Sequence, residues 1–383
     1  MDEGDNSSLL TRLRLDLRGR RFTIEREVLM NLPESVLLCL FPNGLVLSRQ
    51  PALGKNGHLG GEGEDGLGAE GDEEDEEEEE VYMVDFDPSC LSYVLDFFKQ
   101  AQDDFYGVSG QPSRRALAAA APANQQLVGN EYNDGGGFGG PSGPSLLLSK
   151  QAIIVLREEL EYFSIPPKKA ETTDEKGGAT PALLRLKQAC GQALLERKQI
   201  FTALQRNVNK ENNMAEQHLI DMLCMSGFDR DDTWGFRAVE PSRCCITSIA
   251  LVLLKTGIAL SPDDAARSSA ATGSSSVSSD DHEPELQVDQ QQLSTAQKLL
   301  LFWRKPARKC WWDGVDVVLP LDASAGAGAA EAAPPTAAAD AEAMATASGG
   351  GMTQAEVDLL TSGKGRRVRV WARRVWTLEL SLI

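Results

Sequence analysis

The sequence predicts an α+β protein with two ordered regions, each interrupted by long low-complexity inserts. Three observations support this: apolar residues that alternate as in strands, apolar residues at helical spacing, and stretches dominated by Gly, Ala, Ser or Glu. The low-complexity stretches cannot bury a core. Long insertions in surface loops cost little, because closure entropy grows only with the logarithm of length. A chain of 383 residues can therefore hold two domains in spite of its inserts.

The first ordered region begins with a predicted hairpin. Every second residue of 13–17 is apolar, Gly19 supplies a tight turn, and residues 20–25 resume the alternation. Two short helices follow. The first ends at Pro33, and the second carries an apolar stripe over 36–41.

Order returns after an acidic insert. Residues 81–86 are typical of a strand, and in Asp87-Pro88 the aspartate is placed as the N-cap and the proline as the first residue of a helix. Residues 153–163 predict another amphipathic helix. We therefore expect a first domain over 11–167, with disordered inserts at about 51–80 and 102–145.

The second region, 181–383, is expected to form a mixed α/β C-terminal part. Its ordered segments are placed at about 181–260, 298–321 and 366–383, and its disordered linkers at about 261–297 and 322–357. The linker after 260 is rich in serine and can serve as a phosphorylation platform. The expected elements are a long packed helix or coiled coil at 182–208, a helix at 214–227, a buried strand or helix at 244–258, a strand at 315–319 and a terminal strand or hairpin at 368–382.

The net charge of −19 belongs mainly to one segment. Residues 62–80 hold thirteen Asp and Glu and no Lys or Arg, so the rest of the chain carries only −6. We therefore expect no nucleic-acid partner. The chain begins without a signal-peptide pattern and has no apolar run of about 20 residues. Seven cysteines, an odd number, fit reduced thiols in the cytosol or nucleus. We expect a cytoplasmic protein with at most peripheral membrane association through a partner.

Catalytic and metal chemistry have weak support. The chain has only three histidines and no C-x-x-C pair, so we expect no metal site and no cofactor. Asp85-Phe86-Asp87 after a strand matches the start of an aspartate-nucleophile phosphatase, but that fold needs alternating strands and helices around a parallel sheet. A strand end followed by a helix cap is the favoured interpretation, and the chain is expected not to be an enzyme.

Basic and aromatic residues gather in two places that are candidates for binding a partner. In a strand, one face would be buried and arginines would occupy the other. The same residues can hold phosphates, nucleic acid or an anionic membrane, and Trp and Arg are also common hot spots of protein interfaces. The candidates are Arg366, Arg367, Arg369, Trp371, Arg373, Arg374, Trp376, Trp311 and Trp312.

Three segments, 13–41, 81–98 and 155–165, resemble a BTB/POZ domain of the potassium-channel tetramerisation type. The matching motifs are Arg21-Phe22-Thr23 after the first turn, Pro33-Glu34-Ser35 at a helix end, and Asp85-Phe86-Asp87-Pro88. This resemblance implies a protein-interaction module that can form homo-oligomers. His and Cys zinc ligands late in the domain, as some family members have, are not found.

A domain of this type, split by an acidic loop and followed by an Arg/Trp-rich tail, resembles the fungal general stress response regulators known as phosphatase activators. The resemblance implies a scaffold that helps a plasma-membrane phosphatase, promotes stress-responsive transcription and restrains TOR signalling when nutrients fall. The alternatives are a substrate adaptor of a cullin ubiquitin ligase and, from a different class, an aspartate-nucleophile phosphatase.

Overall fold

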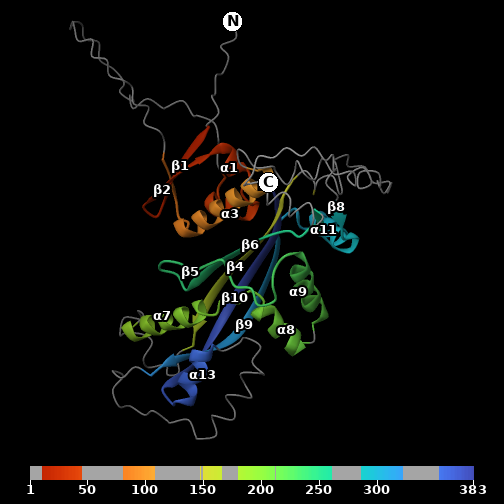
Figure 1. Ribbon diagram of the computed structural model, residues 1–383. Coiled ribbons are helices and arrows are strands. Elements are labelled where there is room, and N and C mark those ends of the chain that lie inside the picture. The colour runs from red at the N-terminus through yellow and green to blue at the C-terminus, as the bar shows by residue number, and fades with distance from the viewer. Residues whose placement is uncertain are drawn as a thin grey trace, which may run out of the picture. The chain divides into compact units, whose positions relative to one another are not determined.

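The computed structural model describes residues 11–44, 81–107, 147, 150–165, 180–211, 213–260, 286–321 and 353–383 (Figure 1). The chain divides into two compact units. The first consists of residues 1–32 and 36–88, and the second of residues 33–35 and 89–383. The acidic run at 62–80, most of the insert at 102–145, the serine-rich stretch at 261–285 and the linker at 322–352 lie outside the described residues.

The first unit contains a three-stranded sheet in the order β2-β1-β3. Strands β1 (Arg12–Leu17) and β2 (Arg20–Glu25) form the expected antiparallel hairpin, and β3 (Val81–Val84) pairs with β1 in parallel. The turn is closed where the Gly19 N–H donates to the Asp16 carboxylate, 2.7 Å away, at a positive φ of 88° that suits glycine. Alternate side chains of β1 are buried, as the period of two predicts.

The helices expected in this part of the sequence are also present. They are α1 (Arg26–Met30), α2 (Glu34–Leu40) and α3 (Pro88–Tyr106), which begins at the predicted proline. Helix α3 continues beyond residue 102, so the second insert begins later than expected. Its apolar face, which includes Leu91, Val94 and Phe98, is buried.

The second unit is built on a five-stranded antiparallel sheet in the order β5-β6-β4-β10-β9. Figure 1 shows the long strands β4, β10 and β9 running side by side. The strands are β5 (Phe236–Val239), β6 (Cys245–Leu253), β4 (Ala152–Ser164), β10 (Gly365–Leu382) and β9 (Ala307–Pro320). A separate hairpin joins β7 (Ile258–Leu260) to β8 (Leu286–Val288).

Helices α7 (Pro181–Leu195), α8 (Thr202–Glu211), α9 (Met214–Ser226) and α11 (Gln290–Trp303) contribute to the core on one side of the sheet, which we call the helix side. Two hydrophobic clusters lie there. One includes Leu156 and Trp376, and the other includes Leu160 and Val370. On the opposite side, Ser35, which belongs to the second unit, donates its backbone N–H to the Glu379 carboxylate.

The helix predicted at 153–163 was wrong, because this segment is strand β4 at the centre of the sheet. Residues 152–156 are buried on both faces of the sheet. A doubly buried strand has no polar alternation, and its apolar residues then also fall at spacings of three and four. These residues belong to the second unit rather than to the first.

Three further boundaries differ from the prediction. The single long helix or coiled coil at 182–208 was wrong, since it is split into α7 and α8, and Arg197 between them forms an ion pair with Glu356 at 2.7 Å. The linkers at 261–297 and 322–357 end earlier than expected, because β8 and most of α11 precede residue 298 and helix α13 (Gln354–Thr361) precedes residue 366. A capping box between Thr353 and Glu356 begins α13.

The C-terminal alternation forms one strand rather than a hairpin. Strand β10 runs for 18 residues and pairs along most of its length with β4 on one side and β9 on the other. No helix among the described segments is long and apolar enough to cross a membrane.

Candidate partner-binding surface

The nine arginine and tryptophan candidates lie on β10 and β9, but the structure divides them between the two sides of the sheet. The β10–β9 register places Trp312 opposite Arg373 and Trp311 opposite Arg374. Because successive residues of a strand point to opposite faces, the first pair shares one side of the sheet and the second pair shares the other. The candidates therefore form two groups with different environments.

The first group forms an exposed aromatic and arginine surface that we call the open patch. Its members are Phe163, Trp312, Arg369, Trp371 and Arg373. The exposed fractions of its three aromatic residues are 51% for Phe163, 59% for Trp312 and 45% for Trp371. The rings of Phe163 and Trp312 stack with their centroids 5.9 Å apart, so part of this apolar surface is already ordered.

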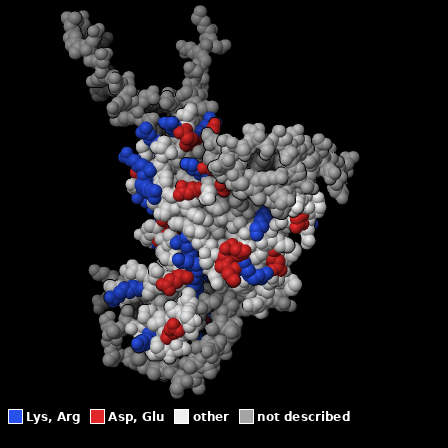
Figure 2. Space-filling view, viewed as in Figure 1, with Lys and Arg blue, Asp and Glu red and all other residues white. Residues whose placement is uncertain are grey.

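The arginines of the open patch are held by carboxylates on the neighbouring strands. Arg369 donates to Asp316 of β9 at 2.9 Å, and Arg373 donates to Glu161 of β4 at 3.0 Å. A Cβ on Gly314 would collide with the Arg369 guanidinium, which shows that this side chain lies flat against the strand. Figure 2 shows basic and acidic residues interspersed over the visible face. The open patch thus presents aromatic rings framed by partly neutralised guanidinium groups.

The second group is buried in an ion cluster on the helix side. Glu158, 1% exposed, accepts hydrogen bonds from Arg374 at 2.7 Å, Arg237 at 2.9 Å and the Trp376 indole at 2.9 Å. Burial by itself would raise the pKa of Glu158, but the two guanidinium groups and the indole N–H overcome it and lower the pKa to about 2. Arg374 and Trp376 are therefore committed to the interior.

This ion cluster lies between the two hydrophobic clusters of the helix side. Along β4, Glu158 is the residue between Leu156 and Leu160 on the same face, and each of these leucines belongs to a different cluster. Arg237 also donates to the Ser248 hydroxyl at 2.5 Å. The group is a structural polar layer, and a partner would have to open the core to reach it.

The remaining candidates have other surroundings. Trp311 packs against Trp376, with ring centroids 5.8 Å apart, and is therefore part of the core. Arg366 is exposed on the helix side near Cys190. Arg367 is exposed, and its strand position places it on the side of the open patch. The candidates selected from the sequence thus lie on two neighbouring strands, but on both faces of the sheet.

Sequence reasoning missed Phe163, Glu161 and Asp316. The first two were assigned to a helix, which hid their pairing with Trp371 and Arg373. Residues Phe163 and Glu161 are two apart, as residues on one face of a strand must be. That spacing was the available signal.

The Asp85 and Asp87 carboxylates of the first unit both face Arg18. The shortest distances are 2.8 Å from the Arg18 Nε to Asp85 and 3.8 Å from its Nη1 to Asp87. Asp87 directly precedes α3, which begins at Pro88. The strand before this motif belongs to a three-stranded sheet, and no set of three His, Cys, Asp or Glu arranged to hold a metal ion occurs within the described residues.

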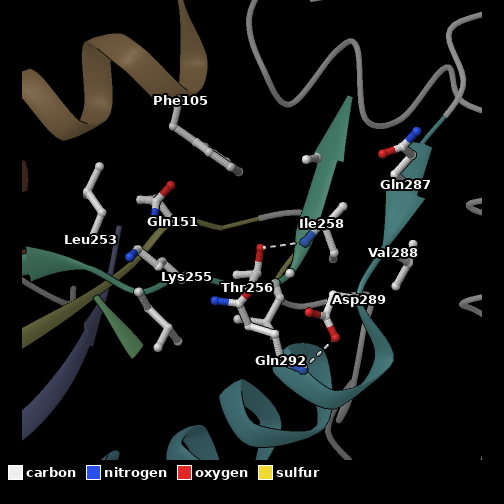
Figure 3. Close-up of a pocket in the computed structure, with 14 residues that line it drawn as sticks. Phe105, Gln151, Leu253, Lys255, Thr256, Ile258, Gln287, Val288, Asp289 and Gln292 are labelled. Atoms are coloured by element: carbon white, nitrogen blue, oxygen red, sulfur yellow. Dashed lines mark hydrogen bonds between the residues drawn. The ribbon is translucent and has the colours of Figure 1, made fainter. Parts of the chain in front are cut away.

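A cavity of about 660 Å³ lies beside the β7–β8 hairpin of the second unit (Figure 3). Polar side chains from Gln151, Lys255 and Gln292 line it together with Phe105 of α3. Asp289, also in its wall, accepts from the Gln291 and Gln292 N–H groups as the N-cap of α11. Its carboxylate is therefore engaged in starting a helix.

Cys190 and Cys245 are poor nucleophiles. Burial, followed by nearby carboxylates, raises the pKa of Cys245 to about 12, and burial also raises the pKa of Cys190 to about 12. Cys245 is the first residue of β6 and is partly buried. Cys310 of β9 is exposed.

Comparison with known proteins identifies relatives over nearly the whole chain. No family model and no solved structure matches the chain. It is 29% identical over 366 residues to a WHI2-like protein of Schizosaccharomyces pombe, a match that covers 96% of this chain and 86% of that protein. It is 26% identical to a growth regulation protein of Saccharomyces cerevisiae, over 97% of this chain and 91% of that protein. The chain is thus similar over nearly its whole length to a WHI2-like protein and to a growth regulation protein of two yeasts.

Proposed function

We propose that this protein is a non-enzymatic regulatory scaffold that restrains growth by binding and activating a protein phosphatase through the open patch. The role in growth regulation is supported by the name of the budding-yeast relative, which matches 97% of this chain. The proposal extends that role to phosphatase binding, to the general stress response and to the restraint of TOR signalling when nutrients fall. The protein acts in the cytoplasm and reaches the plasma membrane only through its partner.

The observation that carries the proposal is the open patch itself. Three exposed aromatic rings and two ion-paired arginines lie on adjacent strands of one sheet, and two of the rings are already stacked. Trp, Tyr and Arg dominate the hot spots of protein interfaces. Rings held on strands lose little conformational freedom when a partner binds, so this surface is preorganised for association.

The first unit gives separate support for a scaffold. Along the chain, its hairpin, two short helices and strand are followed by helix α3 of the second unit, and this order of elements is the one expected of a BTB/POZ module, which serves as an interaction and oligomerisation domain. In this proposal the first unit mediates oligomerisation, and the open patch of the second unit binds the client phosphatase.

The test is affinity capture in Saccharomyces cerevisiae cells that lack their own growth regulation protein. The tagged chain is recovered from stressed and unstressed cells, and its bound proteins are identified by mass spectrometry. The double variant Trp312→Ala/Trp371→Ala should reduce phosphatase recovery at least about tenfold, since truncating hot-spot residues typically costs 2 kcal/mol or more. The change is confined to exposed side chains, so the fold should be retained.

Phe302→Ala is the matched control. Phe302 is also a highly exposed aromatic residue, but it lies on α11. This variant should recover the phosphatase as the unaltered chain does. If no phosphatase is recovered with the unaltered chain, the proposal that the client is a phosphatase is refuted, and recovery of a cullin would favour the ligase adaptor. If the double variant and Phe302→Ala recover equal amounts of phosphatase, the role of the open patch is refuted.

A further inference from the structure

Strand β9 is an edge of the five-stranded sheet, and one half of that edge is closed by side chains. The Asp316 carbonyl accepts from the Arg197 guanidinium at 2.7 Å, and the Val318 N–H donates to the Glu356 carboxylate at 3.1 Å. Glu356 is itself buried and paired with Arg197. At this end the strand is therefore protected against pairing with another chain.

The same two bonds show which residues of β9 face outward. Both N–H and C=O of a strand residue point to the same edge, and the direction alternates from one residue to the next. Even-numbered residues of β9 thus point away from β10. In agreement, odd-numbered Leu321 donates its N–H inward to the Lys364 carbonyl at 2.8 Å.

The other half of the edge is open. The β9–β10 register continues without interruption from Pro320 to Ala307, so Arg308, Cys310 and Trp312 also point their backbone groups outward. Their outward N–H and C=O groups have no hydrogen-bond partner among the described residues. All three residues are exposed. An unprotected strand edge is a template for a further strand.

We propose that the segment Arg308–Trp312 pairs in antiparallel fashion with the same segment of a second copy of this chain. A two-fold axis at Cys310 sets Arg308 opposite Trp312 of the other copy. All outward-facing residues then face one another as hydrogen-bonded pairs, which gives about six backbone hydrogen bonds. This inference does not rest on the proposed phosphatase scaffold, although Trp312 belongs both to this segment and to the open patch.

The side chains of the segment are complementary to themselves in this register. Each basic residue faces a tryptophan of the other copy: Arg308 faces Trp312, and Lys309 faces Trp311. The pair of Arg308 and Trp312 is a favourable cation–π pair, whereas Lys309 already lies over the Trp311 ring of its own chain and pairs with Glu216. No two like charges lie directly opposite. Pro306, which has no N–H, comes opposite Gly314 and ends the pairing. The segment thus limits its own interface to five residues from each copy.

Cys310 at the two-fold axis provides the assay. The purified full-length chain is treated with a short bismaleimide, and cross-linked peptides are identified by mass spectrometry. We expect a Cys310–Cys310 link whose yield rises with protein concentration. A link from Cys310 to another cysteine, or no link at all, would refute the pairing.

A matched pair of variants separates backbone pairing from side-chain effects. Arg308→Pro removes an outward N–H while leaving the inward bonds of β9 to β10, and it should lower the yield of the link at least tenfold. Arg308→Ala retains that N–H and should keep most of the yield. Equal yields from the two variants would contradict the proposal.

Hydrogen exchange of the unaltered chain gives a test that does not depend on how the variants fold. The amides of Arg308, Cys310 and Trp312 should exchange more slowly as the protein concentration rises, while those of β6 should not respond. If the exchange rates of these three amides do not depend on protein concentration, the pairing is refuted. This holds even for a chain that assembles through its first unit, because that assembly would not protect these amides.

Discussion

Replacing Glu158 by Gln should destabilise the second unit by several kcal/mol. Glu158 is 1% exposed and accepts three hydrogen bonds, two of them from guanidinium groups. Glutamine has nearly the same shape but no charge, so it would leave two buried arginines without their counter-ion. Removing one partner of a buried ion pair typically costs about 3–5 kcal/mol.

The pKa of Glu158 gives an independent value for the stabilisation and shows how the stabilisation changes with pH. A pKa of about 2 in the folded protein, against an ordinary value of 4.5, corresponds to about 3 kcal/mol of stabilisation at neutral pH. Because the folded-state pKa is the lower one, this stabilisation is complete above about pH 5.5. It is lost as the pH falls from about 4.5 towards 2, and more than half should be gone by about pH 3.

The assay is denaturant unfolding followed by tryptophan fluorescence, because Trp376 contacts Glu158 directly. The gap in the free energy of unfolding between the unaltered chain and Glu158→Gln should be about 3–5 kcal/mol at pH 7 and should narrow below pH 4.5. Glu161→Gln is the control, since its pair with Arg373 is about 40% exposed and should contribute less than about 1 kcal/mol. Equal losses from the two variants, or a gap that does not change with pH, would refute the reasoning.

Two further predictions follow from the thiols and from the glycines. Maleimide added to the native chain at pH 7.5 should label exposed Cys310 well before Cys190 and Cys245, whose pKa values of about 12 keep them protonated; early labelling of Cys245 by mass spectrometry would contradict this. Gly227→Ala should lower the free energy of unfolding by more than about 2 kcal/mol, because φ is +148° and the new Cβ would lie 2.8 Å from the Leu253 carbonyl. Gly363→Ala, at φ +68° with no atom within 4 Å, should cost only about 1 kcal/mol, and equal losses in denaturation would argue against the clash.

The first unit was the most predictable part of the chain. Its hairpin and two short helices, and helix α3 that begins at its last residue Pro88, are each specified by neighbouring residues: a two-residue alternation, a turn glycine and a proline at the first helical position. Local patterns of this kind act within about ten residues. They can therefore be recognised without any knowledge of the partner strand.

The second unit was less predictable because its central strand is buried on both faces. Residues 152–156 carry no polar alternation. The pattern that identifies a strand is therefore missing, and a helix was predicted instead. Helices α11 and α13 were placed in linkers because their sequences have a weak apolar stripe. Their positions depend on contacts with distant strands, such as those of Glu356 with Arg197 and Val318.

The candidate surface shows the same division. Sequence alternation selected the β10 strand and its arginines and tryptophans, because exposed and buried residues alternate there over 367–372. It did not separate Arg374 from Arg373, which are neighbours in the chain but differ in environment. Arg374 joins a buried carboxylate, whereas Arg373 pairs with a half-exposed one.

The sequence by itself determined the α+β class, the elements of the first unit, the interruption of both regions by inserts, and the choice of β10 as a strand of interest. Only the tertiary structure decided that 152–164 is a strand, that two hydrophobic clusters are separated by the Glu158 ion cluster, and that Phe163 joins Trp312 in the open patch. The physical reason is that periodicity records whether a residue is buried, whereas strand order and register decide which distant residues share a face.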